Sequence, residues 1–100
     1  LQIVGLYDVL LAAVPSPVIE LNRAAAISKR DGPLAALALV DGILQRGELL
    51  DYYLAHSARA EFYRQLGRAE EARGAYRRAL ELTQQLPERR FLEGRLRALK

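Results

Sequence analysis

The chain has 100 residues, of which 51% are hydrophobic and 27% are charged, and its formal net charge is +3. It contains no Cys and one His, which excludes a disulfide framework, thiolate zinc ligation and a histidine-rich metal site. Its apolar stretches are too short to span a bilayer, so we expect no membrane partner. The absence of Cys is compatible with a reducing compartment, and we expect a cytoplasmic protein with no cofactor. It has no Met and begins at Leu1, from which we expect a piece of a longer polypeptide, folded as a single domain over residues 1–100.

The start of the chain predicts two helices that are separated by a break containing proline. Apolar residues at helical spacing predict the first helix over residues 2–14. Pro15 ends it, Ser16 is suited to cap the next helix, and Pro17 falls at a first helical position, where a missing N–H costs nothing. We therefore expect the second helix over residues 17–30.

Glycine and proline mark the remaining helix boundaries. Gly32 supplies the backbone conformation that follows a helix end, and Pro33 opens the next helix. Later in the chain, Gly67 is expected to end the fourth helix and Pro87 to open the sixth. The expected helices span residues 33–45, 48–66, 69–85 and 88–99.

The predicted connections are only two to four residues long, so neighbouring helices must be antiparallel. No segment shows the alternating pattern of a strand. The sequence therefore predicts an all-α fold in which six antiparallel helices form about three stacked hairpins.

A repeat with a spacing of 36 residues supports this arrangement. Self-similarity at about this period, with small residues on paired helices, is typical of a helical-hairpin solenoid. Solenoids of this kind hold partner proteins and are not catalysts, so we expect no enzyme activity. The first copy is Ala24, Ile27, Asp31, Ala36, Val40 and Ile43, and the second is Ala60, Tyr63, Gly67, Ala72, Tyr76 and Ala79.

The second copy, with Leu80 and a later Pro87, resembles one tetratricopeptide repeat. This resemblance implies a right-handed solenoid. Both copies depart from the pattern just before the first small residue, where Arg23 and Arg59 replace a large apolar side chain. The shared departure indicates a specialised branch.

A wider set of short motifs covers nearly the whole chain. Together they resemble a bacterial RNA polymerase sigma factor of the extracytoplasmic-function type that carries a C-terminal tetratricopeptide-like extension. In the first half the motifs are Leu6-Tyr7-Asp8, Pro15-Ser16-Pro17-Val18, Glu20-Leu21-Asn22-Arg23-Ala24 and Asp31-Gly32-Pro33. In the second half they are Ala58-Arg59-Ala60, Leu66-Gly67-Arg68, Glu71-Ala72, Ala75-Tyr76, Ala79-Leu80-Glu81-Leu82 and Glu88-Arg89-Arg90-Phe91-Leu92.

The resemblance implies a regulatory role in transcription initiation. The promoter-binding regions, which make the main DNA contacts, would lie upstream of this chain. The chain itself would contact the sigma core, RNA polymerase or a regulatory protein. Two alternatives stay open: a generic tetratricopeptide scaffold that binds an extended peptide, and a basic domain that contacts nucleic acid.

Four polar residues occupy equivalent repeat positions: Glu20 with His56, and Arg23 with Arg59. Residues three apart share a helix face, so each copy should direct its pair into one seam. One interpretation is an internally paired seam that fixes helix register, because a buried guanidinium without a partner is costly. The other is a groove that offers arginines to a partner carboxylate. The available internal acids are Glu20, Asp8 and Asp41.

The inner groove of such a solenoid supplies further candidates. Asn22 has poor helix propensity in mid-helix, so it should bond either to a neighbouring loop or to a partner. Glu61, Arg64 and Gln65 are either peptide contacts or plain solvated surface. The full set of expected groove residues is Leu21, Asn22, Ser28, Ser57, Glu61, Arg64 and Gln65.

No catalytic arrangement is evident in the sequence. His56 has only Ser57 and Arg59 as close polar neighbours, and adjacent helical residues point about 100° apart. We therefore expect His56 to lie in the polar seam and not to act as a catalytic base. Glu70 and Glu71 suit the first turn of a helix better than a role as an acid–base pair.

Charge is uneven along the chain: residues 1–50 carry four basic and five acidic side chains, and residues 51–100 carry eleven and seven. Arg90 and Arg97 lie seven residues apart, on one face of the last helix. This basic face is either the solvent-exposed side of a terminal helix that caps the solenoid or a contact for DNA or RNA polymerase.

Overall fold

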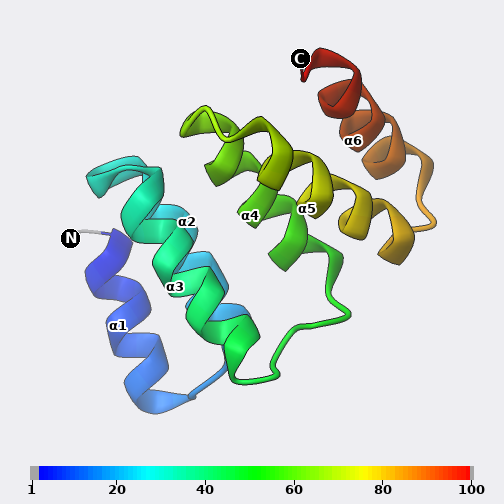
Figure 1. Cartoon of the computed structure of the whole chain (residues 1–100). Coiled ribbons are helices and arrows are strands. Elements are labelled where there is room, and N and C mark those ends of the chain that lie inside the picture. Colours follow the sequence, from blue (N-terminus) through cyan, green and yellow to red (C-terminus); the bar gives the residue numbers. More distant parts are fainter. Residues whose placement is uncertain (1–2, 100) are drawn as a thin grey trace. The chain divides into compact units, whose positions relative to one another are not determined.

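The structure is a computed structural model that describes residues 3–99. Within these residues the chain forms six α-helices and no β-strand, which confirms the predicted all-helical class (Figure 1). The chain divides into two compact units, Leu1–Leu50 and Asp51–Lys100. None of the helices between residues 3 and 99 has the length and apolarity needed to cross a bilayer.

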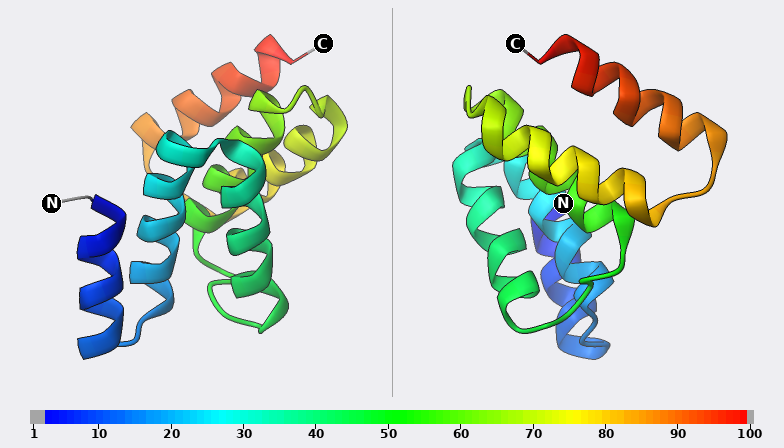
Figure 2. Two further views of the ribbon diagram at one scale, coloured as in Figure 1. Left: turned by 90° about the vertical axis from the view of Figure 1, so that its left-hand side faces the viewer. Right: turned by 45° about the vertical axis from the view of Figure 1, so that its right-hand side comes forward.

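The first unit contains three helices close to their predicted positions. Gln2, predicted as the first helical residue, lies outside the described residues. Both views in Figure 2 show α2 and α3 as antiparallel neighbours joined by a tight turn. The bounds are α1 (Ile3–Ala13), α2 (Pro17–Asp31) and α3 (Pro33–Gln45).

Local chemistry sets the ends of α2. The Ser16 side chain accepts a hydrogen bond from the Ile19 amide at 3.4 Å, and Pro17 occupies the start of the helix, as predicted. At the other end, the Gly32 amide donates to the Ser28 carbonyl at 2.9 Å. Gly32 has a φ of 96°, which disfavours any residue with a side chain, and it turns the chain directly into α3.

The core of the first unit is built around α2, which packs on both α1 and α3. α1 buries only one face, since Ile3 and Val9 are each 64% exposed. The buried residues are Val4 of α1, Leu21, Ala24 and Ile27 of α2, and Ala36, Leu37, Val40 and Ile43 of α3.

The fourth helix begins at Tyr53, so the prediction that it begins at Glu48 is wrong. Gly47 has a φ of 81° and Leu49 a φ of 59°, and two left-handed residues so close together cannot belong to a right-handed helix. Arg46 Nε donates to Glu48 Oε1 at 2.8 Å and holds Glu48 in the loop.

The second unit contains three helices. The prediction that the fifth helix reaches Gln85 is wrong, because Thr83 has extended backbone and its hydroxyl accepts from the Gln85 amide at 3.4 Å. The loop is fastened by Arg89, whose Nη1 donates to the carbonyls of Leu80 at 2.7 Å and Thr83 at 2.9 Å. The bounds are α4 (Tyr53–Gln65), α5 (Ala69–Leu82) and α6 (Leu86–Ala98).

The two copies of the repeat have the same burial pattern. Gly67, at the turn between α4 and α5, has a φ of 76°. The other aligned positions are buried in both copies: Ala24 and Ala60, Ile27 and Tyr63, Ala36 and Ala72, Val40 and Tyr76, and Ile43 and Ala79.

Candidate functional site

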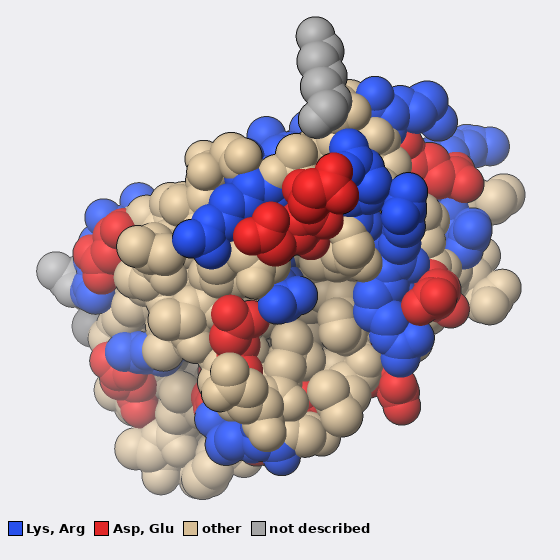
Figure 3. Space-filling view, viewed as in Figure 1, with Lys and Arg blue, Asp and Glu red and all other residues tan. Residues whose placement is uncertain are grey.

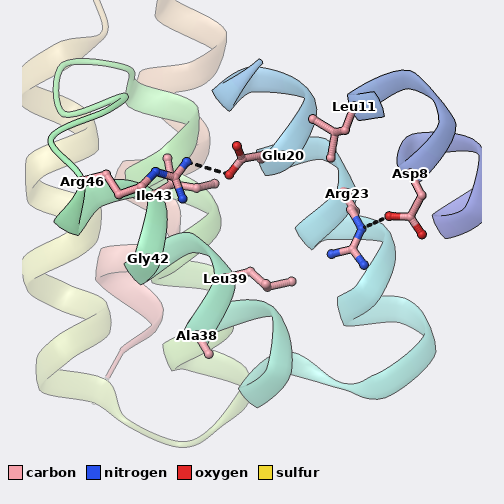
Figure 4. Close-up of a pocket in the computed structure, with 9 residues that line it drawn as sticks. All are labelled: Asp8, Leu11, Glu20, Arg23, Ala38, Leu39, Gly42, Ile43 and Arg46. Atoms are coloured by element: carbon pink, nitrogen blue, oxygen red, sulfur yellow. Dashed lines mark hydrogen bonds and ion pairs between the residues drawn. The ribbon is translucent and has the colours of Figure 1, made fainter. Parts of the chain in front are cut away.

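The first unit contains a hollow of about 340 Å³ between α1, α2 and α3, which we call the first hollow. Figure 4 shows its residues, with Leu39 and Ile43 of α3 and Leu11 of α1 as apolar lining. Four charged side chains surround this lining: Asp8 from α1, Glu20 and Arg23 from α2, and Arg46 just after α3.

These charged side chains form two ion pairs. Arg23 Nε lies 2.6 Å from Asp8 Oδ1, and Arg46 Nη2 lies 2.7 Å from Glu20 Oε2 (Figure 4). Asp8 was among the acids expected to be near Arg23. Arg46 was missed by the sequence reasoning, because no local pattern pairs it with a residue 26 positions away.

Arg23 uses only part of its hydrogen-bonding capacity. Its Nε bonds to Asp8, while neither terminal nitrogen has a hydrogen-bond partner among residues 3–99. A guanidinium can use two nitrogens to bind a carboxylate in a forked arrangement. Hydrogen bonds from Arg46 to Glu20 and Glu48 raise the pKa of Arg46.

In the second unit, Glu61 of α4 is the centre of a polar network. It accepts hydrogen bonds from Arg64 at 3.0 Å, from Arg95 of α6 at 2.9 Å, and from the Tyr76 hydroxyl of α5. Burial acts to raise the pKa of Glu61, but these three hydrogen bonds outweigh it and hold the pKa below its usual range. Burial, with the hydrogen bond to Glu61, also raises the pKa of Tyr76.

The remaining groove candidates differ in exposure. Leu21 is only 5% exposed and belongs to the core, so the prediction that it is displayed is wrong: its face of α2 packs inward. Asn22 and Gln65 are exposed. Ser28 is half-buried, and Ser57 lines a separate hollow in the second unit. Their proposed contacts with a partner stay predictions.

Arg59 and His56 lie half-buried on α4. Arg59 Nη2 donates to the Tyr63 hydroxyl at 3.0 Å, and its guanidinium lies 4.9 Å from the centre of the Tyr63 ring. The Asp8 carboxylate is thus one neighbour of Arg23, and the Tyr63 ring is one neighbour of the repeat-equivalent Arg59.

Arg90 and Arg97 are exposed on α6, and their role as a basic contact face stays a prediction. Figure 3 shows a group of basic side chains on the visible face of the second unit, with acidic side chains bordering it. No group of three or more His, Asp or Glu side chains within residues 3–99 is arranged to hold a metal ion.

The chain is similar to one part of a longer bacterial protein. An uncharacterized protein of Rhizobium meliloti (strain 1021) is 45% identical to it over 91 residues. The match covers 91% of this chain but only 21% of that protein, so the chain spans about a fifth of its relative's length. No protein-family model matches the chain. No solved structure matches it significantly.

Proposed function

We propose that this chain is a non-catalytic, protein-binding regulatory domain: the C-terminal extension of an extracytoplasmic-function type sigma factor, acting in the cytoplasm. One observation carries the proposal. The motifs Leu6-Tyr7-Asp8 and Glu20-Leu21-Asn22-Arg23-Ala24, on which the resemblance rests, supply Asp8, Glu20 and Arg23 to a single hollow. Motif residues that meet at a partly open, charged surface are better suited to recognition than to packing alone.

The chemistry of the first hollow fits an acidic group on a protein partner. A carboxylate from a side chain or a chain terminus would bind the terminal nitrogens of Arg23. Apolar groups beside that carboxylate would contact Leu39 and Leu11. The partner would be the sigma core, RNA polymerase or a signalling protein, and its binding would change when promoters are used.

We also propose that the helices form a tetratricopeptide-like solenoid. The support is the shared burial of the repeated positions, with small side chains at Ala24, Ala36, Ala60 and Ala72 that let paired helices approach closely. The segment that matches in the Rhizobium relative makes up 21% of that protein.

Transcription by the full-length protein that contains this chain tests the regulatory role. We expect promoter output to change when the codons for residues 1–100 are deleted. Unchanged output under all inducing conditions would contradict the proposal. The sequence upstream of Leu1 separates the alternatives, since DNA-binding helices there favour a sigma factor and their absence favours a generic scaffold.

Substitution in the first hollow tests the binding role. We expect Arg23→Gln and Arg46→Gln to weaken partner binding about tenfold or more, because each removes a cation that faces the hollow. Stability should change by less than about 1 kcal/mol, because both ion pairs are partly exposed. Arg30→Gln is the matched control, since Arg30 pairs with Asp31 at the end of α2, outside the hollow. Equal losses in all three variants would contradict a specific site.

A further inference from the structure

The outward side of α1 is an apolar surface, which we call the α1 stripe. Residues three and four apart share one side of a helix, and every residue on this side is aliphatic. Val14 follows the helix directly, and its amide donates to the Leu10 carbonyl at 2.7 Å, so it extends the stripe. The five larger side chains are between 41% and 64% exposed. The stripe consists of Ile3, Leu6, Val9, Leu10, Ala13 and Val14.

The inward side of α1 faces α2 and holds the charge of the helix (Figure 2). Val4 is buried on this side, and Asp8, the one charged residue of α1, forms its ion pair with Arg23 of α2. The α1 stripe therefore has neither a charge nor a hydrogen-bonding side chain. A contiguous exposed apolar surface is typical of a site that binds another surface.

The size of the stripe matches a small dimer interface. Placing two stripes face to face would remove on the order of 1,000 Å² from water, given the exposed fractions of the five larger side chains. This area is at the lower limit for a specific protein–protein contact. The dimer should therefore be reversible.

The composition of the stripe favours a second copy over a different protein. Interfaces between identical chains are more apolar than contacts between different proteins, in which charged groups contribute more to partner selection. The α1 stripe offers no charge to such a partner, whereas two copies of it are complementary to each other.

The charges at the ends of α1 favour an antiparallel pair. The N-terminal end of a helix carries a partial positive charge and the C-terminal end a partial negative charge, so antiparallel neighbours attract each other. The exposed Lys29 of α2 lines a hollow together with Ile3, at the N-terminal end of α1. An antiparallel pair brings this cation close to the C-terminal end of the other α1, whose last turn contains no basic residue.

We infer that this chain forms a symmetric dimer in which the α1 stripes of two copies pack antiparallel about a twofold axis near the middle of the helix. Leu6 and Leu10 lie on either side of that axis, so Leu6 of one copy packs on Leu10 of the other. Ile3 of one copy then lies opposite Ala13 of the other. Burial of apolar surface drives the association.

This dimer is independent of the first hollow and of the sigma-factor proposal, because the stripe and the hollow lie on different sides of α1. A chain that stays single would leave the carboxylate site and the transcriptional role standing. Failure of either of those proposals would leave the dimer standing.

Sedimentation equilibrium of the 100-residue chain measures the association. Between about 1 and 500 µM we expect the average mass to rise from one chain to two, with a dissociation constant in the micromolar range. The mass of a single chain at all concentrations would overturn the inference. Association that continues beyond two chains would also overturn it, because a twofold contact closes on itself.

A charge on the stripe tests its role. Val9→Glu should weaken the dimer at least about a hundredfold, because it brings two like charges together next to the twofold axis. Val9 is 64% exposed, so the single chain should keep its helical circular dichroism signal. Leu34→Glu is the matched control, since Leu34 is 62% exposed on α3, and it should leave the dimer unchanged. Wild-type affinity in Val9→Glu, or equal losses in both variants, would overturn the inference.

Crosslinking tests the antiparallel arrangement, and the chain suits it because it contains no Cys. Under mild oxidation, a mixture of Ile3→Cys and Ala13→Cys chains should form a disulfide between the two variants. Each variant alone should crosslink at least about tenfold more slowly, because identical positions lie at opposite ends of the pair. Crosslinking of the separate variants as fast as that of the mixture would overturn this arrangement.

Discussion

Glu61 joins three helices of the second unit through one carboxylate. Its side chain is 20% exposed, and its donors come from α4, α5 and α6. Because several hydrogen bonds favour the ionised form, Glu61 is more acidic in the folded chain than in the unfolded chain. The network therefore links stability to pH.

We predict that Glu61→Gln makes the chain less stable at neutral pH and less sensitive to acid. The unfolded pKa of Glu is about 4.3, and the folded pKa of Glu61 is lower. The stabilisation is complete above the unfolded pKa and is lost as pH falls through the folded pKa. At pH 7 the loss should be about 1–3 kcal/mol.

Urea unfolding at neutral and acid pH measures this effect. The difference in stability between wild type and Glu61→Gln should shrink on acidification, whereas the exposed control Glu93→Gln should track the wild type throughout. A Glu61→Gln deficit that is the same at both pH values would show that the carboxylate charge does not carry the stabilisation.

The sequence assigned Glu61 correctly to a helix but did not predict its partners. Arg95 is 34 residues away, and pairing across that distance depends on how α6 packs against α4. The pairing of Glu20 with Arg46 was missed for the same reason. Asp8 was one of three acids named as possible partners of Arg23, and the structure shows that it is the one that pairs with Arg23 Nε.

At the scale of elements, turns with glycine were predictable because their chemistry is local. Gly32 and Gly67 lie at positive φ where turns were expected, and the third helix has its predicted bounds of residues 33–45. The start of α4 was not predictable, because Leu49 adopts a φ of 59° that its residue type disfavours. The surrounding loop, and not the residue type, accounts for the backbone conformation of Leu49.

We predict that Gly67→Ala destabilises the chain by about 1–2 kcal/mol. A Cβ at Gly67 meets no atom within 4 Å, so the cost comes only from forcing Ala to a φ of 76°.

Gly74→Ala is the matched control, for which we expect the opposite effect on stability. Gly74 lies exposed within α5, a Cβ there also meets nothing within 4 Å, and Ala should stabilise the helix by about 0.5–1 kcal/mol. Thermal unfolding of both variants measures the two effects. Shifts of the same sign would contradict the assignment of Gly67 to a left-handed turn.

At the scale of the whole molecule, residues 51–100 carry more basic than acidic side chains, but several of the basic ones are paired with acids. Arg64, Arg73, Arg78 and Arg95 all form ion pairs with acids of the second unit. Figure 3 shows acidic side chains bordering the basic ones on the visible face of that unit. A mixed surface of this kind attracts the DNA backbone much less than a purely basic one.

We therefore predict weak, nonspecific DNA binding that is lost between about 50 and 200 mM salt. Fluorescence anisotropy with a short duplex measures it, and the double variant Arg90→Glu, Arg97→Glu reports on the basic face of α6. Tight binding at about 200 mM salt that this double variant abolishes would instead favour the nucleic-acid alternative.

Arg89 fastens α6 to the end of α5 by binding two main-chain carbonyls, those of Leu80 and Thr83. Every amino acid supplies the same carbonyl, so this connection places no chemical requirement on the side chains at positions 80 and 83. Related chains could replace both residues and keep the joint, provided that position 89 stays arginine. Substitutions at position 89 would then not correlate with substitutions at positions 80 and 83. A contact that orients α6 would be visible in related sequences only as a retained arginine at position 89.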